Sequence, residues 1–295
     1  MSLDRPIVIV GVGRSGSTVF HHLFTRHPHV AWLADLEDRW AYKPWINRLV
    51  LRGVDLPLLG RGFRHTFDPG ESYPFWDAVF PGFTMPHRDL RADDLLPHVQ
   101  RALLARCATV PTGARQRLLF KVTGWPRVGF FKALFPDVRL IHVSRDGRPV
   151  TASMLRMPWW SGWRGPEGWG WGELSAEHRA EWERHHRSFV ALGGIQWKIL
   201  MEAMEEGKRA VAPTEVLELR YEDICRDPIA AYRSAVAFAG LEWTPGFDAV
   251  VRAHPFRSEN DRWRRDLTAE QQVVLESVLA PALARYGFGG APPTR

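Results

Sequence analysis

The sequence predicts an α/β fold, a single domain built on a P-loop-like, doubly wound parallel sheet flanked by helices. Two observations support this prediction. Continuous apolar runs rich in β-branched residues alternate with segments of helical pattern, and a glycine- and serine-rich loop directly follows the first such run. Of the 295 residues, 45% are apolar and 24% are charged, which is ordinary for a globular protein. Because no linker or internal repeat is visible, we treat residues 1–295 as one domain.

The first elements are the clearest. Residues 6–10, Pro-Ile-Val-Ile-Val, form a continuous apolar run and predict a buried parallel strand. After the glycine-rich turn, the pattern predicts a helix over 18–26 with Val19 and Leu23 facing the core. A second short strand is expected over 30–33.

The alternation continues to the end of the chain. Residues 41–95 have no clear period and predict an irregular insertion over one end of the sheet, and 156–173 predict a loop rich in Trp and Gly. Asp146 can cap the helix that carries residues 149–155. The remaining expected strands are 117–122, 138–143 and 215–219, and the remaining helices are about 93–107, 128–134, 176–206, 228–240 and 268–285.

The composition excludes several classes of protein. The two cysteines, Cys107 and Cys225, cannot form a disulfide framework, and no Cys/His spacing suits a metal. The net charge of +6 allows an anionic partner, but no basic stripe or reading motif indicates nucleic acid. No apolar run approaches the roughly 18 residues of a spanning helix, and no signal peptide is evident. We therefore expect a cytoplasmic protein without nucleic-acid, membrane or metal partners, whose oligomeric state stays open.

The loop after the first strand has the features of a phosphate site. It begins a helix, so backbone N–H groups and the helix dipole both point at it. Its small residues let an anion approach the backbone, and Arg14 adds a cation. The candidate binding residues are Gly13, Arg14, Ser15, Gly16, Ser17 and Thr18.

Two other interpretations of this loop remain open. The Walker pattern of nucleotide triphosphatases and kinases fits at Gly11, Gly16 and Thr18, but its lysine position is Ser17. Such a site would lack the cation that reaches the β- and γ-phosphates. The second interpretation is a tight turn without a ligand. However, Arg14 at a helix N-terminus opposes the helix dipole unless an anion lies between them.

A second loop of similar context follows the strand at 138–143. Arg145 stands at the end of that strand, and Ser153 lies two turns into the next helix, so the two side chains could bind one phosphate from two sides. Because strand carboxyl ends meet along one edge of a doubly wound sheet, both loops should face one crevice. Two anion sites in one crevice suit a ligand with two separated phosphates.

These residues resemble the sulfotransferase superfamily, in particular its soluble bacterial members. The loop at 14–18 looks like the family's 5'-phosphosulfate loop, and the Arg145 and Ser153 pair looks like its 3'-phosphate motif. The resemblance implies transfer of a sulfuryl group from 3'-phosphoadenosine 5'-phosphosulfate to a hydroxyl or amine, without a metal. It extends in order through residues 120–127, 135–136, 219–223, 227–228 and 262–267.

The resemblance also suggests catalytic residues. Arg14 would stabilise charge on the bridging oxygen of the donor, and Asn260 and Arg262 lie in a segment similar to the late donor-binding loop. The cytosolic branch has a catalytic histidine after a Lys-Thr pair, but none follows Lys121-Val122-Thr123 here. Other branches use an acidic residue after the second strand. The candidate general bases are therefore Asp35, Glu37 and Asp38.

The acceptor is not identified by the sequence. We expect the segments 41–95 and 156–173 to form its pocket, because many of the 14 Trp residues suit stacking on a small or medium-sized natural product. Phenol, sugar, peptide and lipid-like hydroxyls all stay open. The alternatives to a sulfotransferase are a nucleotide kinase or NTPase and a non-catalytic sensor of adenosine bisphosphate.

Overall fold

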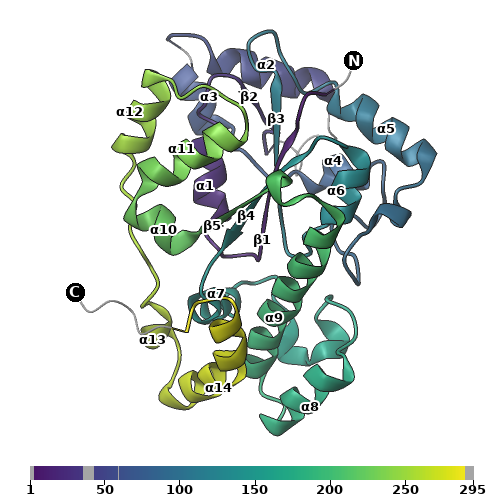
Figure 1. The fold of residues 1–295 in the computed structure, drawn as a ribbon, viewed down its shortest axis with the longest axis vertical. Coiled ribbons are helices and arrows are strands. Elements are labelled where there is room, and N and C mark those ends of the chain that lie inside the picture. Colours follow the sequence, from purple (N-terminus) through teal and green to yellow (C-terminus); the bar gives the residue numbers. More distant parts are fainter. Residues whose placement is uncertain (1–2, 36–42, 59, 290–295) are drawn as a thin grey trace.

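A parallel sheet forms the centre of the part of the chain that the computed structural model describes, residues 3–35, 43–58 and 60–289 (Figure 1). The strands are β1 Ile7–Gly11, β2 Val30–Ala31, β3 Arg117–Thr123, β4 Arg139–Ser144 and β5 Val216–Arg220. Their order is β2-β3-β1-β4-β5, and every neighbouring pair is parallel. The predicted parallel α/β fold is confirmed.

The strand register aligns the loops that carry the predicted site. Gly11 at the end of β1 lies opposite Thr123 at the end of β3, and Ser144 at the end of β4 lies opposite Arg220 at the end of β5. The loops that leave these four strands therefore start at the same edge of the sheet, as expected for a doubly wound topology.

Helices cover both faces of the sheet (Figure 1). A further group lies beyond the carboxyl edge, where α9 (Phe189–Gly207) packs against α7 (Gly147–Met154) and α14 (Ala269–Arg285). On one side are α1 Ser17–Phe24, α10 Tyr221–Arg226, α11 Pro228–Phe238 and α12 Pro245–Ala253, and on the other are α4 Tyr73–Asp77, α5 Pro97–Cys107 and α6 Val128–Leu134. The carboxyl-edge group comprises α7 Gly147–Met154, α9 Phe189–Gly207, α13 Trp263–Asp266 and α14 Ala269–Arg285.

The inward face of α1 differs from the prediction. Val19 is exposed rather than buried, whereas Phe20 and Phe24 face the core and their rings stack. The helix begins at Ser17, and its buried positions are spaced three and four residues apart from there, which places Val19 on the outer side. Leu23 is buried as predicted.

The prediction of an irregular segment at 41–95 is wrong. Within its described residues it contains α2 Pro44–Val54, α3 Gly60–Thr66, α4 and a 3-10 turn at Ala92–Asp94. The helices α3 and α4 are short, and their stability comes from packing rather than from propensity, which hides them from a sequence pattern. The helix α2 has buried positions at helical spacing, a signal that the sequence analysis overlooked. Asn47 of α2 accepts the N–H of Ala34 and donates to the carbonyl of Trp32, which holds α2 against the chain beyond β2.

The long helix predicted at 176–206 is two helices, α8 Ala176–Arg184 and α9. Between them His186 and Arg187 have positive φ angles of 54° and 58°, which a continuous helix cannot contain. The sequence analysis also missed α10, α12 and α13. In contrast, the predicted cap of α7 is confirmed, because the Asp146 carboxylate accepts the N–H of Arg148 at 2.8 Å.

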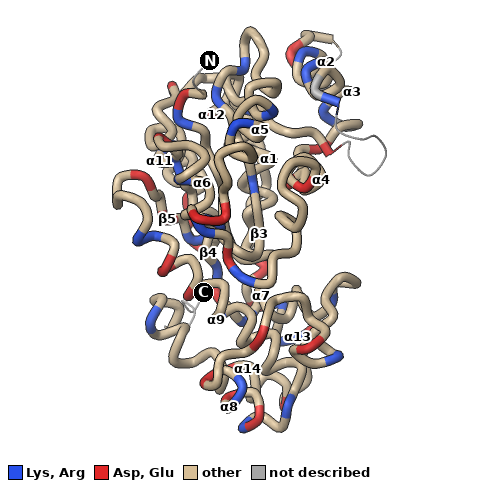
Figure 2. Tube along the Cα trace, turned by 90° about the vertical axis from the view of Figure 1, so that its right-hand side faces the viewer, with Lys and Arg blue, Asp and Glu red and all other residues tan. Residues whose placement is uncertain are grey.

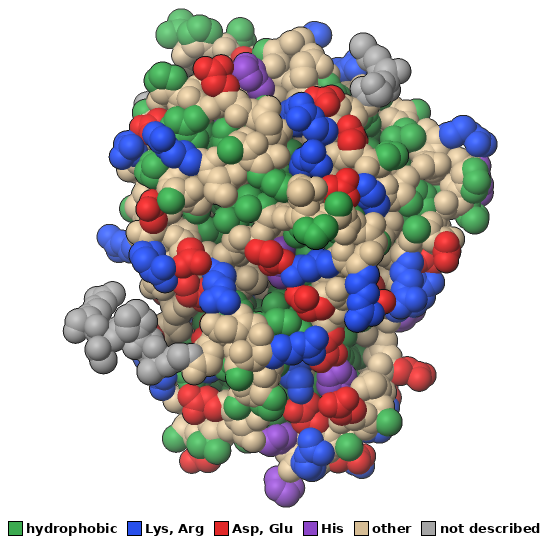
Figure 3. Space-filling view, viewed as in Figure 1, with side chains coloured by type: hydrophobic (Ala, Val, Ile, Leu, Met, Phe, Trp, Pro, Cys, Tyr) green, Lys and Arg blue, Asp and Glu red, His purple; other side chains and the backbone are tan. Residues whose placement is uncertain are grey.

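The surface carries mixed charge. On the face shown in Figure 3, acidic and basic side chains intermingle. Among the described residues, no helix combines the length and apolar character needed to cross a bilayer.

Candidate functional site

The loop between β1 and α1 forms a tight concave turn. Arg14 and Gly16 adopt left-handed φ angles of 72° and 87°. A Cβ on Gly16 would overlap the ring of Tyr221, so both the backbone and the space require glycine there. Nothing lies within 4 Å of a Cβ placed on Gly13, where the loop is open. At the start of α1 the first-turn amides have no helical acceptors, which leaves them available to an anion.

Two hydroxyls of this loop do not face the pocket. Ser15 and Ser17 are buried, and the Ser15 hydroxyl has no hydrogen-bond partner among the described residues. The Ser15 backbone amide already donates to the carbonyl of Val12, so the backbone amide of Ser17 is the group of these two residues that could contact a phosphate. Thr18, by contrast, is exposed and lines the pocket described below.

Arg14 joins the two predicted phosphate loops. Its Nε donates to Ser153 Oγ of α7 at 2.9 Å, and its backbone oxygen accepts Nη1 of Arg145 at 3.2 Å. The two loops that the sequence analysis matched by context alone are thus bonded to each other in the structure.

Arg145 is held in place from three sides. Its guanidinium lies 4.0 Å from the ring centroid of Tyr221, and its Nε donates to Asn260 Oδ1 at 2.8 Å. Asn260 in turn donates to Glu222, which also accepts the N–H of Asp146. Burial lowers the pKa of Arg145, and the nearby Tyr221 and Glu222 oppose that effect. The guanidinium is therefore a fixed cation at the floor of the crevice.

A pocket of about 380 Å³ lies between the two loops. Its charged side chains are four arginines and two acids, so it has an excess of two positive charges. Asp266 binds Arg156 at 2.8 Å and approaches Arg262 at 3.5 Å, which restrains both. The lining residues are Arg14, Gly16, Thr18, Val19, Arg145, Pro149, Ser153, Arg156, Tyr221, Glu259, Arg262, Trp263 and Asp266.

A buried ion pair adjoins the loop on the β3 side. Lys121 Nζ donates to Thr18 Oγ1 at 2.9 Å and pairs with Glu71 Oε1 at 2.8 Å. Glu71 also accepts the N–H and the hydroxyl of Thr123. Burial alone would raise the pKa of Glu71, but the charge and hydrogen bond of Lys121, with hydrogen bonds from Tyr73 and Thr123, outweigh burial and lower it.

Comparison with known proteins agrees with this geometry. The family model described as "Sulfotransferase family" matches residues 6–245. The chain belongs to this family. The curated omega-hydroxy-beta-dihydromenaquinone-9 sulfotransferase Stf3 of Mycobacterium bovis is 23% identical over 326 residues, which cover 98% of this chain and 77% of that protein. The protein is therefore a sulfotransferase, as predicted, with relatives in bacteria.

Solved sulfotransferases share the fold. STF9 of Mycobacterium avium has a TM-score of 0.56 and 18% identity, covering 97% of this chain and 77% of its own. The mouse sulfotransferase SULT7A1, solved with PAP, has a TM-score of 0.50 and 12% identity, covering 97% and 86%. At these identities the likeness concerns the arrangement of the chain.

The candidate bases of this sulfotransferase are only partly described. Asp35 is exposed where the chain leaves β2, and its backbone N–H donates to the carbonyl of Asp68. The backbone of Gly70 lies against the side chain of Asp35. Asp35 is therefore close to the residue that precedes Glu71. Glu37 and Asp38 lie outside the described residues.

Sequence reasoning did not name several residues that line or adjoin the pocket between the two loops. Glu71 and Arg156 come from segments with no phosphate-binding pattern, whereas Tyr221 and Asp266 lie within the segments 219–223 and 262–267 that carry the resemblance. A further signal for Tyr221 is its position directly after β5, at the same strand edge as Arg145. Trp125 is buried and packs near Trp171, with ring centroids 6.2 Å apart.

The two segments expected to form the acceptor pocket do meet. The backbone of Gly172 packs against the carbonyl of His87, and Gly170 faces Met85. A hollow of about 770 Å³ lies at this junction, lined in part by Arg88. Trp171 covers Gly124, which directly follows Thr123 of β3, so the Trp-rich segment reaches the end of the strand that carries Lys121.

Proposed function

We propose that this sulfotransferase moves the sulfuryl group of 3'-phosphoadenosine 5'-phosphosulfate to a hydroxyl, or an amine, of a small or medium-sized acceptor. The observation that carries the proposal is the pocket between the two loops. It contains fixed cations at two separate places, Arg14 and Arg145, which are joined through the Arg14 carbonyl. A ligand with phosphate-type groups at its 5' and 3' positions matches that pair.

The residues of the pocket suit this donor. The open space beside Gly13 and the free amides at the start of α1 fit the 5' group, together with Arg14 and Thr18. Arg145 and Ser153 fit the 3'-phosphate, with Arg262 at the pocket rim and Asn260 orienting Arg145. The donor supplies a sulfuryl group already bonded to its leaving group.

Fixed positive charge is the main catalytic contribution of the chain. During in-line transfer, negative charge grows on the bridging oxygen of the leaving group, and preorganised donors stabilise it. Arg14 is positioned for this role by its bond to Ser153. Lys121 is the second candidate cation, because Thr18 and Glu71 hold its ammonium group against the donor loop.

A carboxylate after β2 would accept the proton of the acceptor. We assign this role to one of Asp35, Glu37 and Asp38, as the sequence suggested, and Asp35 is the described member. Glu71 is less suited to it. Lys121 and Thr123 already donate to its carboxylate, and its lowered pKa makes it a weak base. Glu71 instead positions Lys121.

The acceptor would lie where the segments 41–95 and 156–173 meet. Their contacts at Gly172 and Gly170, and the hollow beside them, support this assignment. The name of the curated relative gives a hydroxylated menaquinone derivative as its substrate, which favours a small-molecule acceptor here.

Calorimetric titration tests the donor. Adenosine 3',5'-bisphosphate should bind without added metal and more tightly than ATP or Mg-ATP. In a coupled assay, the labelled donor should release adenosine bisphosphate faster when a suitable phenol, alcohol or quinol is added. Preference for Mg-ATP over the bisphosphate would contradict the proposal.

A further inference from the structure

The outer face of α2 is unusual for a surface helix. Its inner positions Asn47, Val50, Leu51 and Val54 are buried, as in any amphipathic helix. Its outer positions alternate large apolar and basic side chains: Trp45, Arg48, Leu49 and Arg52. At 3.6 residues per turn these four fall within one arc of about 100°. Trp45 and Leu49 are 62% and 56% exposed, and the described helix Pro44–Val54 itself contains no acidic residue.

The turn after α2 continues this pattern. Leu56 and Leu58 are 48% and 94% exposed, and α2 and α3 lie together at the outer edge of the molecule (Figure 2). Among the described residues, eleven large apolar side chains are exposed, and four of them lie between Trp45 and Leu58. Such clustering distinguishes this surface from the scattered exposed apolar residues that every protein has.

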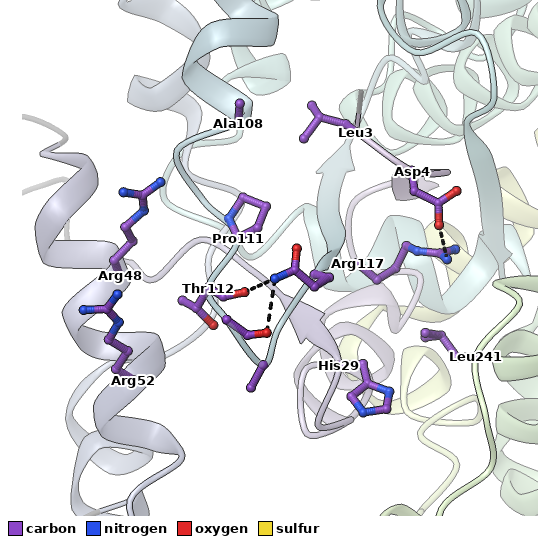
Figure 4. A pocket seen from close by; sticks show the side chains of 13 residues that line it. Leu3, Asp4, His29, Arg48, Arg52, Ala108, Pro111, Thr112, Arg117 and Leu241 are labelled. Atoms are coloured by element: carbon purple, nitrogen blue, oxygen red, sulfur yellow. Dashed lines mark hydrogen bonds and ion pairs between the residues drawn. The ribbon is translucent and has the colours of Figure 1, made fainter. Parts of the chain in front are cut away.

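A groove of about 760 Å³ adjoins the basic side of α2. Figure 4 shows Arg48 and Arg52 on its α2 wall and the Asp4–Arg117 ion pair on the opposite side. Arg48 Nε donates to the carbonyl of Thr109 at 2.7 Å, which fixes the side chain at the groove. Within the described part of the chain, neither Arg48 nor Arg52 forms an ion pair, so the groove has two uncompensated positive charges.

The groove is separate from the sulfotransferase site. Asp4 precedes β1, and Arg117 is the first residue of β3, so the groove lies at the amino edge of the sheet. The pocket with Arg14 and Arg145 lies at the carboxyl edge. Neither the donor nor the acceptor of the proposed reaction accounts for the basic groove or for the exposed side chains of α2.

We propose that the outer face of α2 and the adjoining groove dock the protein on an anionic phospholipid surface. Trp45 and Leu49 would enter the interfacial region, which Trp side chains favour, and Arg48 and Arg52 would bind headgroup phosphate in the groove. Within α2, apolar and basic side chains without an acid are complementary to an anionic surface. This proposal gives the protein a peripheral membrane partner, where the sequence analysis expected none.

Vesicle co-sedimentation tests this. The full chain should bind vesicles of equimolar phosphatidylcholine and phosphatidylglycerol, bind those of phosphatidylcholine alone much more weakly, and release from the former as salt is raised. The double variants Arg48→Gln/Arg52→Gln and Trp45→Ala/Leu49→Ala should each weaken binding by about tenfold or more.

Two controls match these variants. Arg184→Gln on α8 and Val273→Ser on α14 change exposed residues of the same kinds elsewhere and should leave vesicle binding unchanged. All variants should keep the unfolding temperature and the affinity for adenosine 3',5'-bisphosphate of the unaltered chain, which separates this result from the proposed reaction. The proposal is wrong if the unaltered chain does not prefer the anionic vesicles. It is also wrong if either double variant binds them as well as the unaltered chain does.

Discussion

Arg14 Nε and Ser153 Oγ lie 2.9 Å apart, although 139 positions separate the two residues in the sequence. The bond links the loop after β1 to the second turn of α7. A donor that bridges the two loops therefore meets side chains that are already placed, and little ordering entropy remains to be lost on binding.

Arg145 should determine the affinity for the 3'-phosphate. Arg145→Ala removes a charge-assisted bond and should weaken binding of adenosine 3',5'-bisphosphate by about 30-fold, or about 2 kcal/mol. Adenosine 5'-monophosphate, which lacks that phosphate, should bind the variant and the unaltered protein alike. Titration calorimetry with both nucleotides measures the difference.

Arg265→Ala is the matched control for Arg145, since Arg265 is exposed on α13 and does not line the pocket. Equal losses for both nucleotides in Arg145→Ala would show that Arg145 supports the structure of the pocket rather than the 3'-phosphate.

Arg14 should act mainly in the transition state. Arg14→Ala should lower kcat by about 10²-fold or more, the scale of a lost oxyanion donor. Ser153→Ala keeps the cation but removes its partner, so its effect on kcat should be smaller. Steady-state kinetics with varied donor separates the two contributions. Near-normal kcat with a raised donor KM would assign Arg14 to ground-state binding.

The general base should be one of the acids after β2. Of the single variants Asp35→Asn, Glu37→Gln and Asp38→Asn, one should lose about 10²-fold in kcat while still binding adenosine bisphosphate. In that variant the fall in rate at acidic pH should disappear, because no carboxylate remains to protonate. Asp68→Asn, next to this segment, is the control. If all three amides keep full activity, the base lies elsewhere.

Glu71 should affect the rate through Lys121. Glu71→Gln should lower kcat, but the fall in rate at acidic pH should remain. If Glu71 were the general base, that fall would disappear in the variant. Because the pKa of Glu71 is lowered on folding, its stabilising effect is present above its ordinary pKa of 4.5 and is lost as pH falls below that value. Unfolding in denaturant across that range should therefore be less pH-dependent in Glu71→Gln, and an unchanged pH dependence would disprove the ion pair.

Glycine at position 16 should be indispensable for the donor loop. Gly16→Ala would strain a φ of 87° and overlap the Tyr221 ring, so it should lower stability by about 1 kcal/mol or more and abolish bisphosphate binding. Gly13→Ala meets no protein atom within 4 Å and should leave the unfolding temperature unchanged. Thermal unfolding of both variants compares them directly. Equal stability would refute the packing argument.

The sheet and the donor loop were predictable because their signals are local. A buried parallel strand is a continuous apolar run, and the glycine loop follows it without interruption, so β1 and Arg14 could be placed from a dozen residues. Arg145 and Ser153 were predictable for the same reason, since one strand end and one helix fix their separation.

The surroundings of the loop depend on contacts between distant segments. Glu71 reaches Lys121 because the chain around Pro69 pairs with Ala34, and Gly16 must be glycine because Tyr221 lies above it. No spacing rule connects such positions. The short helices α3 and α4 were missed because tertiary packing, not helix propensity, stabilises them.

The contact between Gly16 and Tyr221, with the bond between Arg145 and Asn260, has a consequence for biosynthesis. The phosphate loop leaves the ribosome well before the residues that brace it, because Tyr221 and Asn260 come much later in the sequence. A nascent chain stalled before Tyr221 has the loop without the ring that packs on Gly16. A chain stalled before Asn260 has Arg145 without its hydrogen bond to the Asn260 amide. Because chains emerge from the amino end, nucleotide can assist only the closing stage of folding, after most of the sheet has been synthesised.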